Sequence, residues 1–228
     1  MNIAFIPVRG GSKSIPLKNI KILNGKPLVY WTAKAANDAM FVDKVIIATD
    51  SEEIKSTVLS FGFDKLEVYD RNPANAQDTS STESVMVEYI EKSELEGEDK
   101  FILIQATSPL LKSNHIDEMY EKLLNSDADS IFSGVREKQF HWIETLQGVE
   151  PINYDYKNRP RRQDFNGIIA ENGACYINSV KNILENNCRI SGKIITYEMP
   201  PETAYEIDEP SDWLIIENIM KEGYRNEN

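Results

Sequence analysis

Cysteine and histidine are scarce in this sequence. Its 228 residues include two cysteines, Cys175 and Cys188, and two histidines, His115 and His141. Two cysteines are too few for a disulfide framework, so we expect both to be reduced thiols. Because a tetrahedral zinc site needs several cysteine or histidine ligands, the sequence also argues against zinc. A magnesium site built from carboxylates stays open.

Long apolar runs and a general excess of basic residues are also missing. No apolar run reaches the roughly 20 residues that span a membrane, and no charged segment of a signal peptide precedes the first one. The net charge of −12 would repel a nucleic-acid backbone over most of the surface. The sequence therefore predicts a cytoplasmic protein that binds neither membranes nor nucleic acid.

Acidic residues are absent from the start of the chain. None precedes Asp38. The six basic residues before it are Arg9, Lys13, Lys18, Lys21, Lys26 and Lys34. Several of them lie in a loop that follows the apolar run 3–6 and contains Gly10 and Gly11. Glycine lets the backbone approach a ligand closely, and loop N–H groups with nearby cations bind anions, so we expect a polyphosphate ligand.

A simpler interpretation of this loop stays open. Gly10 and Gly11 could form an ordinary turn, and the lysines could be solvated surface residues. The loop contains neither of the common phosphate motifs, G-x-x-x-x-G-K-[ST] and G-x-G-x-x-G. The phosphate interpretation is favoured because the loop leaves a predicted strand, and open α/β sheets bind their ligands where strands end.

Apolar runs alternate with helix patterns along most of the chain. Strands are predicted at residues 2–8, 44–49, 66–69, 101–105, 130–135, 174–177, 194–197 and 205–208. Helices are predicted at 27–39, about 51–61, about 82–92, from about 113, at 179–187 and at 210–221. This alternation is typical of a mostly parallel, doubly wound α/β sheet. The length suits one domain, 1–228. Residues 136–172 show no regular period, so we expect them to form an arm or a lid.

Two acidic residues near the end of the chain are candidate metal ligands. Glu206 and Asp208 are two residues apart in a segment predicted as extended, so both carboxylates point to one face. Facing carboxylates and phosphate oxygens are the ligands that Mg²⁺ prefers. Asp208 could also cap the helix that opens at Pro210, with Asp212 complementing the helix dipole, and both roles can coexist.

The run IPVRGGSKSIPLKNI, residues 6–20, resembles the N-terminal motif of the acylneuraminate cytidylyltransferases, the CMP–sialic acid and CMP–nonulosonic acid synthetases. The resemblance covers about residues 2–220. It implies a Rossmann-like nucleotide-diphospho-sugar transferase fold with a dimerisation arm, a homodimer, and Mg²⁺ as cofactor. It also implies that CTP and an acidic nine-carbon sugar are the substrates.

The resemblance implies roles for individual residues. The nucleotide-binding set is Arg9, Ser12, Lys13, Lys18, Asn19, Arg71, Ser80 and Thr82. The sugar-binding set is Gln105, Thr107, Ser108, Arg162 and Tyr176. The catalytic set is Arg9, Lys18 and Asp208, with Glu206 and Asp208 on the metal. These roles suit the residue types, because cations neutralise charge on a transferred phosphate and on departing pyrophosphate.

Two of the matching segments also fit an ordinary structural role. The segment RNPANAQDTSST, residues 71–82, could be the start of a helix with Thr79, Ser80 or Ser81 as N-cap and Glu83 completing a capping box. The Ala-Thr-Ser-Pro segment after Gln105 could simply separate a strand from a helix.

The chain departs from the family pattern at four places. Leu111 stands where the family usually has arginine, and Glu206 stands where aspartate is more common. Ala170-Glu171 replaces an arginine of some members, and Arg189-Ile190 replaces a phenylalanine pair that sialic-acid enzymes can place around the N-acyl methyl. The last two changes suggest a different or more polar pocket for the sugar's substituents.

The implied activity is transfer of CMP from CTP to the anomeric hydroxyl of an N-acylneuraminate-type 2-keto-3-deoxy sugar acid, with release of pyrophosphate. The same chemistry on legionaminic, pseudaminic or octulosonic acid stays open. So does a non-catalytic nucleotide-sugar binding protein.

Overall fold

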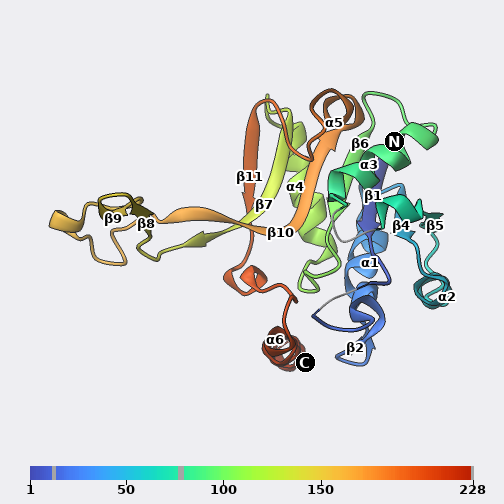
Figure 1. Cartoon of the computed structure of the whole chain (residues 1–228), viewed down its shortest axis with the longest axis horizontal. Helices are drawn as coiled ribbons and strands as arrows, with labels where there is room; N and C mark the ends of the chain where they lie inside the picture. The colour runs from blue at the N-terminus through green and yellow to red at the C-terminus, as the bar shows by residue number, and fades with distance from the viewer. Residues whose placement is uncertain (12–13, 77–79, 227–228) are drawn as a thin grey trace.

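The computed structural model of the chain describes residues 1–11, 14–76 and 80–226. Its centre is a seven-stranded sheet with the order β11-β7-β10-β6-β1-β4-β5 (Figure 1). The strands are β1 (Asn2–Pro7), β4 (Lys44–Thr49), β5 (Leu66–Asp70), β6 (Lys100–Ile104), β7 (Ser130–Glu137), β10 (Ile168–Ser179) and β11 (Ile194–Glu198). β10 is antiparallel to β6 and β7, whereas the other pairs are parallel. The prediction of a mostly parallel α/β sheet is confirmed.

Helices connect these strands, and two short strand pairs lie outside the main sheet. The α-helices are α1 (Leu28–Asp38), α2 (Glu52–Leu59), α3 (Thr82–Lys92), α4 (Ser113–Leu124), α5 (Val180–Asn186) and α6 (Pro210–Asn226). The 3-10 helices are η1 (Lys18–Ile20), η2 (Pro73–Asn75), η3 (Tyr156–Asn158) and η4 (Pro201–Ala204). The short pairs are β2 (Ile22–Leu23) with β3 (Lys26–Pro27), and β8 (Trp142–Thr145) with β9 (Gly148–Pro151). Among the described residues, no helix has the length and apolarity to cross a membrane.

Apolar side chains cover both faces of the sheet. Ile102 faces a core that also contains side chains of α1, α2 and α4, and its neighbour Leu103 faces a core with side chains of α3 and α5. Successive residues of a strand point to opposite faces, so a strand buried on both sides reads as a continuous apolar run. This is why β1, β4 and β6 are recognisable in the sequence.

A third apolar cluster joins the N-terminal loop to the last helix. Ile15 and Leu28 pack in it with Ile207, Trp213 and Ile216, and all five side chains are buried. These residues come from opposite ends of the chain. The cluster therefore brings the basic loop after β1 next to the acidic segment before α6.

Residues 136–172 contain more regular structure than the sequence patterns predict. β7 continues to Glu137, β10 begins at Ile168, and β8 with β9 forms a hairpin between them. Figure 1 shows this hairpin far from the sheet, at the end of extensions of β7 and β10. Nearly all residues of β8 and β9 are exposed, so they lack the apolar alternation that identifies a half-buried strand.

The predicted strand at 205–208 is wrong. These residues form a loop between η4 and α6, and the N–H of Ile207 donates to the carbonyl of Thr107 at 2.8 Å. At the start of α6, Asp212 is the acidic residue of the first turn, as expected, and its Oδ2 accepts from the N–H groups of Asp208 and Glu209 at 3.0 and 2.7 Å.

A buried polar network holds η4 against the sheet. The side chain of Asn172 accepts from the Ser133 hydroxyl at 2.7 Å and donates to the carbonyl of Thr203 at 3.2 Å. The Ser133 hydroxyl in turn accepts from the N–H of Cys175 at 2.9 Å. Since buried polar groups are costly to leave unpaired, this network fixes the chain just before Glu206.

Candidate active site

Lys18 joins the two ends of the chain. Its Nζ donates to the carbonyl of Ile207 at 2.9 Å and lies 3.3 Å from Oδ1 of Asp208. Ser14 adds a bond from its hydroxyl to the carbonyl of Asp208 at 2.6 Å. The Lys18 side chain is 13% exposed, whereas that of Asp208 is 66% exposed. The ammonium is thus held in place, while the Asp208 carboxylate is open to a further ligand.

Glu206 lies deeper in the same loop. Burial raises the pKa of Glu206, and the neighbouring Asp208 carboxylate raises it further. Lys18 and a hydrogen bond with the Thr107 side chain act in the opposite direction. The structure therefore brings the predicted residues Lys18, Thr107, Glu206 and Asp208 together.

The backbone of Gly173 allows a close approach at this point. Gly173 has a φ of +69°, and a Cβ added to it would lie 3.1 Å from Oε1 of Gln105 and 3.2 Å from Oε2 of Glu206. The ends of these two side chains consequently meet over β10, beside the carboxyl end of β6. Gln105, a predicted sugar-binding residue, belongs to the same group as the two acidic residues.

The start of the basic loop packs against the end of β4. The N–H of Gly10 donates to Oδ1 of Asp50 at 3.0 Å, and a Cβ on Gly10 would lie 3.0 Å from the Cβ of Ser51. A side chain at this position would therefore press on Ser51, so the small size of glycine suits the close packing. The amide of Asn19 donates to the carbonyl of Arg9 at 3.1 Å, which ties η1 to this end of the loop. The predicted residues Ser12 and Lys13 lie outside the described residues.

Arg71 is buried at the same edge of the sheet, with 7% of its surface exposed. Its Nη2 donates to the carbonyl of Asn75, and its Nε is buried without a hydrogen-bond partner among the described residues. Burial lowers the pKa of Arg71, and its electrostatic neighbours are Asp50, Glu88 and Arg9. A buried guanidinium with an unpaired N–H is suited to a ligand oxygen.

Ser80 and Thr82 lie at the start of α3. The Ser80 hydroxyl donates to the carbonyl of Ala74 at 3.3 Å. Ser81 is the N-cap, because its Oγ accepts from the N–H of Ser84 at 3.1 Å. The predicted capping-box role of Glu83 is wrong, since that carboxylate pairs with an arginine instead.

That arginine belongs to a chain of contacts that the sequence did not reveal. Nε of Arg189 lies 2.6 Å from Oε1 of Glu83, and its guanidinium lies 5.1 Å from the ring centroid of Tyr176. The Tyr176 hydroxyl donates to Glu171. Tyr176 is buried, and burial together with Glu171 raises the pKa of its hydroxyl. Arg189 and Glu171 stood out only as departures from the family pattern, because 106 residues separate Glu83 from its partner.

Ser108 is buried, and its hydroxyl has no hydrogen-bond partner in the described part of the chain. Its N–H donates to the carbonyl of Gln105 at 3.2 Å. Leu111, which departs from the arginine expected from the resemblance, is buried in the core on the α4 side of the sheet and makes apolar contacts there.

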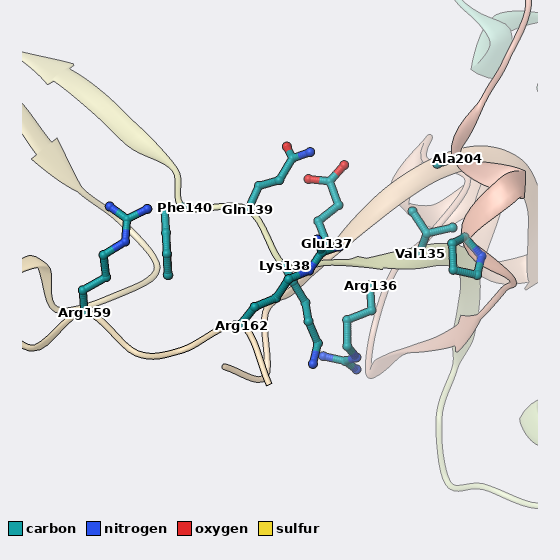
Figure 2. A pocket seen from close by; sticks show the side chains of 10 residues that line it. Val135, Arg136, Glu137, Lys138, Gln139, Phe140, Arg159, Arg162 and Ala204 are labelled. Carbon is teal, nitrogen blue, oxygen red and sulfur yellow. The ribbon is translucent and has the colours of Figure 1, made fainter. Parts of the chain in front are cut away.

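Arg162 belongs to the segment between η3 and β10. It lines a cavity of about 560 Å³ together with Arg136, Lys138 and Arg159 (Figure 2). The guanidinium of Arg159 lies 4.4 Å from the ring centroid of Phe140. The described lining of this cavity includes none of the residues grouped around Asp208. Arg162 thus shares this cavity with Pro201 and Ala204 of η4, and no contact between Arg162 and Lys18, Thr107, Glu206 or Asp208 is found among the described residues.

The two acidic residues fit a metal that is held partly by a phosphate ligand. Among residues 1–11, 14–76 and 80–226, no group of three or more His, Cys, Asp or Glu side chains is placed to hold an ion. Mg²⁺, however, is usually bound through one or two carboxylates, with phosphate oxygens and waters as the other ligands. The open carboxylate of Asp208, with Glu206 nearby, matches that donor set.

The crowding at Gly173 can be tested by comparing two Gly→Ala substitutions at similar positive φ, of which only one meets neighbouring side chains. Gly173→Ala adds a methyl group against Gln105 and Glu206, whereas Gly62→Ala adds one at a similar φ of +66° with nothing within 4 Å. We expect Gly173→Ala to lower the free energy of unfolding by about 1 kcal/mol more than Gly62→Ala, measured by urea denaturation. Equal losses would show that the two side chains do not crowd Gly173.

Several known proteins resemble this chain in sequence. N-acylneuraminate cytidylyltransferase A of Danio rerio is 39% identical over 226 residues, which cover 97% of this chain and 51% of that protein. The N-acylneuraminate cytidylyltransferase of Streptococcus agalactiae serotype V is 30% identical, with 94% and 52% covered. This chain thus spans about half the length of both. Pseudaminic acid cytidylyltransferase of Campylobacter jejuni serotype O:23/36 is 28% identical, with 99% and 98% covered.

Solved structures share the fold. CMP:2-keto-3-deoxy-manno-octonic acid synthetase complexed with CTP superposes with a TM-score of 0.70 at 16% identity, covering 97% of this chain and 99% of that one. A 4-diphosphocytidyl-2C-methyl-D-erythritol synthase gives 0.69 at 12% identity, covering 96% and 98%. The profile of the family described as Cytidylyltransferase matches residues 3–220, in agreement with the motif at the N-terminus. On this evidence of sequence and fold, the chain belongs to the cytidylyltransferase family.

Proposed function

We propose that the chain transfers CMP from CTP to the anomeric hydroxyl of an N-acylneuraminate-type 2-keto-3-deoxy sugar acid and releases pyrophosphate. The observation that carries the proposal is the contact of Lys18 with Asp208, next to Thr107 and Glu206. It combines a phosphate-binding cation with two candidate metal ligands at the carboxyl ends of the parallel strands, where such sheets bind nucleotides. The N-acylneuraminate cytidylyltransferases among the relatives support the choice of donor and acceptor.

The basic residues bind the triphosphate. Arg9 and Lys18, together with Ser12, Lys13 and Asn19, neutralise and orient its oxygens, and Lys18 faces the α-phosphate. Arg71, Ser80 and Thr82 contact the cytosine and the ribose. The Nε of Arg71, which has no hydrogen-bond partner among the described residues, supports this assignment, because a ligand oxygen would satisfy it.

The acceptor hydroxyl attacks the α-phosphorus in line with the leaving group. A bond forms between that hydroxyl oxygen and phosphorus, the hydroxyl gives its proton to a water molecule, and the bond from phosphorus to the bridging oxygen of pyrophosphate breaks. Fixed cations stabilise the charge that develops on the phosphate and on pyrophosphate. Asp208 and Glu206 would hold Mg²⁺, which would supply further charge neutralisation.

Gln105, Thr107, Ser108 and Tyr176 form the acceptor side of the site. A second acceptor, pseudaminic acid, is favoured by one observation, the match to the Campylobacter enzyme over nearly the full length of both chains. The charged contacts around Tyr176 agree with a pocket for a more polar sugar than N-acetylneuraminate. Legionaminic and octulosonic acids complete the range of acceptors to be tested.

The chain acts as a homodimer built from a single domain, 1–228, whose arm spans about 136–172. Large apolar side chains are exposed on the hairpin of the arm, among them Leu146, Val149 and Ile143. A second copy that covers them would remove apolar surface from water. Arg162 then reaches the acceptor carboxylate in the partner's site.

The activity is tested by pyrophosphate release with CTP and a panel of 2-keto sugar acids. We expect release with CTP and at least one nine-carbon acid, and none with UTP. Release without any sugar acid, or with UTP alone, would contradict the proposal. Nucleotide binding without turnover on any acceptor would instead indicate the non-catalytic binding protein.

The role of Asp208 is tested by Asp208→Ala. Product formation should fall by about a hundredfold or more, because a metal ligand is lost, while CTP binding measured by calorimetry largely survives. Asp127→Ala is the control, since Asp127 also pairs with a lysine, Lys193, on an exposed surface. Retained turnover in Asp208→Ala would reject the metal role.

The shared site is tested by mixing two inactive variants. Arg162→Ala and Asp208→Ala each damage a different half of the site. If Arg162 acts in the partner's site, subunit exchange restores about a quarter of wild-type activity, since about half of the dimers are mixed and each has one intact site. A mixture no more active than the separate variants would show that both residues act within one chain.

A further inference from the structure

A carboxylate inside α3 collects four hydrogen-bond donors. Glu88 is 8% exposed, and its Oε1 accepts from the Tyr69 hydroxyl at 2.7 Å, from the N–H of Asn72 at 2.9 Å and from Nζ of Lys92 at 3.0 Å. Its Oε2 accepts from Nδ2 of Asn75 at 2.6 Å. Two of the donors belong to the turn that follows β5, so a helix on one face of the sheet anchors a loop at its edge.

The anchored turn is fixed at both ends. Asn72 gives its N–H to Glu88, and its side chain accepts from the N–H of Ala74 at 2.9 Å to cap η2. Asn75, at the other end of η2, gives its side-chain amide to Glu88. Loss of the carboxylate would therefore release both ends of η2 together.

Arg71 depends on this turn for its orientation. Its backbone N–H donates to the carbonyl of Thr49 at 3.1 Å, which fixes the backbone of Arg71 at the carboxyl end of β4. Its Nη2 donates to the carbonyl of Asn75, the residue whose side chain Glu88 holds. The direct path from helix to guanidinium is thus Glu88, Asn75 and Arg71.

An apolar residue would be the simpler choice for the position of Glu88. Its neighbours in α3 include the buried residues Val85, Met86 and Ile90. A buried carboxylate is costly unless it is fully hydrogen-bonded. Although burial raises the pKa of Glu88, the donors lower it to about 2, so the group stays charged at neutral pH. A carboxylate at this buried position is therefore explained by its hydrogen bonds to the η2 turn.

We propose that Glu88 is a positioning residue that aims the Arg71 guanidinium at the bound nucleotide. The proposal rests on the proposed function, because CTP is the ligand that Arg71 meets. In this proposal Glu88 itself makes no contact with CTP. It acts through the η2 turn, so its effect on CTP requires Arg71.

The test compares Glu88→Gln with wild type and with the double variant Glu88→Gln/Arg71→Ala. Glutamine keeps the size of the side chain but replaces one acceptor oxygen by a donor. We expect the CTP Kd and KM to rise about tenfold, the size of one charge-assisted hydrogen bond, with kcat at saturating CTP nearly unchanged. In the Arg71→Ala background, Glu88→Gln should add nothing, since residues that act through one another are not additive.

Glu118→Gln in α4 is the matched control. Glu118 also accepts from a tyrosine hydroxyl, that of Tyr197 at 2.5 Å, and from an asparagine amide, that of Asn114 at 3.2 Å. Its loss should leave the CTP Kd unchanged. Should Glu88→Gln fail to fold, Tyr69→Phe removes one donor alone and should raise the Kd in the same direction by a smaller factor.

Three results would overturn the proposal. The first is an unchanged CTP Kd in both Glu88→Gln and Tyr69→Phe, and the second is an equal rise in the Arg71→Ala background. The third is a fall in kcat without a change in KM. These results leave the proposed function intact, whereas a wild-type chain that binds no CTP would refute that function and this role together.

Discussion

The contact of Lys18 with Asp208 depends on the apolar cluster beneath it. Ile15 and Leu28 on the basic side of this contact pack with Ile207 and Trp213 on the acidic side, so two segments from opposite ends of the chain meet over a shared core. An ion pair with one exposed partner contributes little stability by itself. The apolar packing supplies the free energy that holds the two segments together, so the charged side chains can bind a ligand.

Elsewhere along the edge of the sheet, too, buried side chains hold the backbone in place and other side chains have capacity left for a ligand. Asn172 and Ser133 hold the chain before Glu206, and Glu88 holds the turn after Arg71. These buried groups are fully occupied with the protein itself. The Asp208 carboxylate is 66% exposed, and the Nε of Arg71 has no hydrogen-bond partner in the described part of the chain, so both have capacity left for a ligand. On a chain of net charge −12, the basic loop also gives an anionic substrate a local attraction.

The sequence predicts the parts of this fold that are buried on both faces. β1 and β6 are read correctly because their apolar runs are continuous. The hairpin of the arm is missed because its residues are exposed, and the loop at Glu206 was mistaken for a strand because extended backbone alone does not make a sheet. In the site, Lys18 and Asp208 are recognised by motif and chemistry. The pairing of Arg189 with Glu83 depends on tertiary packing and leaves no local pattern.

The account is tested most directly by a crystal structure with CTP and Mn²⁺ in place of Mg²⁺. We expect an anomalous peak at Asp208, phosphate oxygens in contact with both the metal and Lys18, and the nucleoside beside Arg71. A triphosphate bound elsewhere, or a metal peak away from Asp208, would contradict the claim that the two ends of the chain form one nucleotide site.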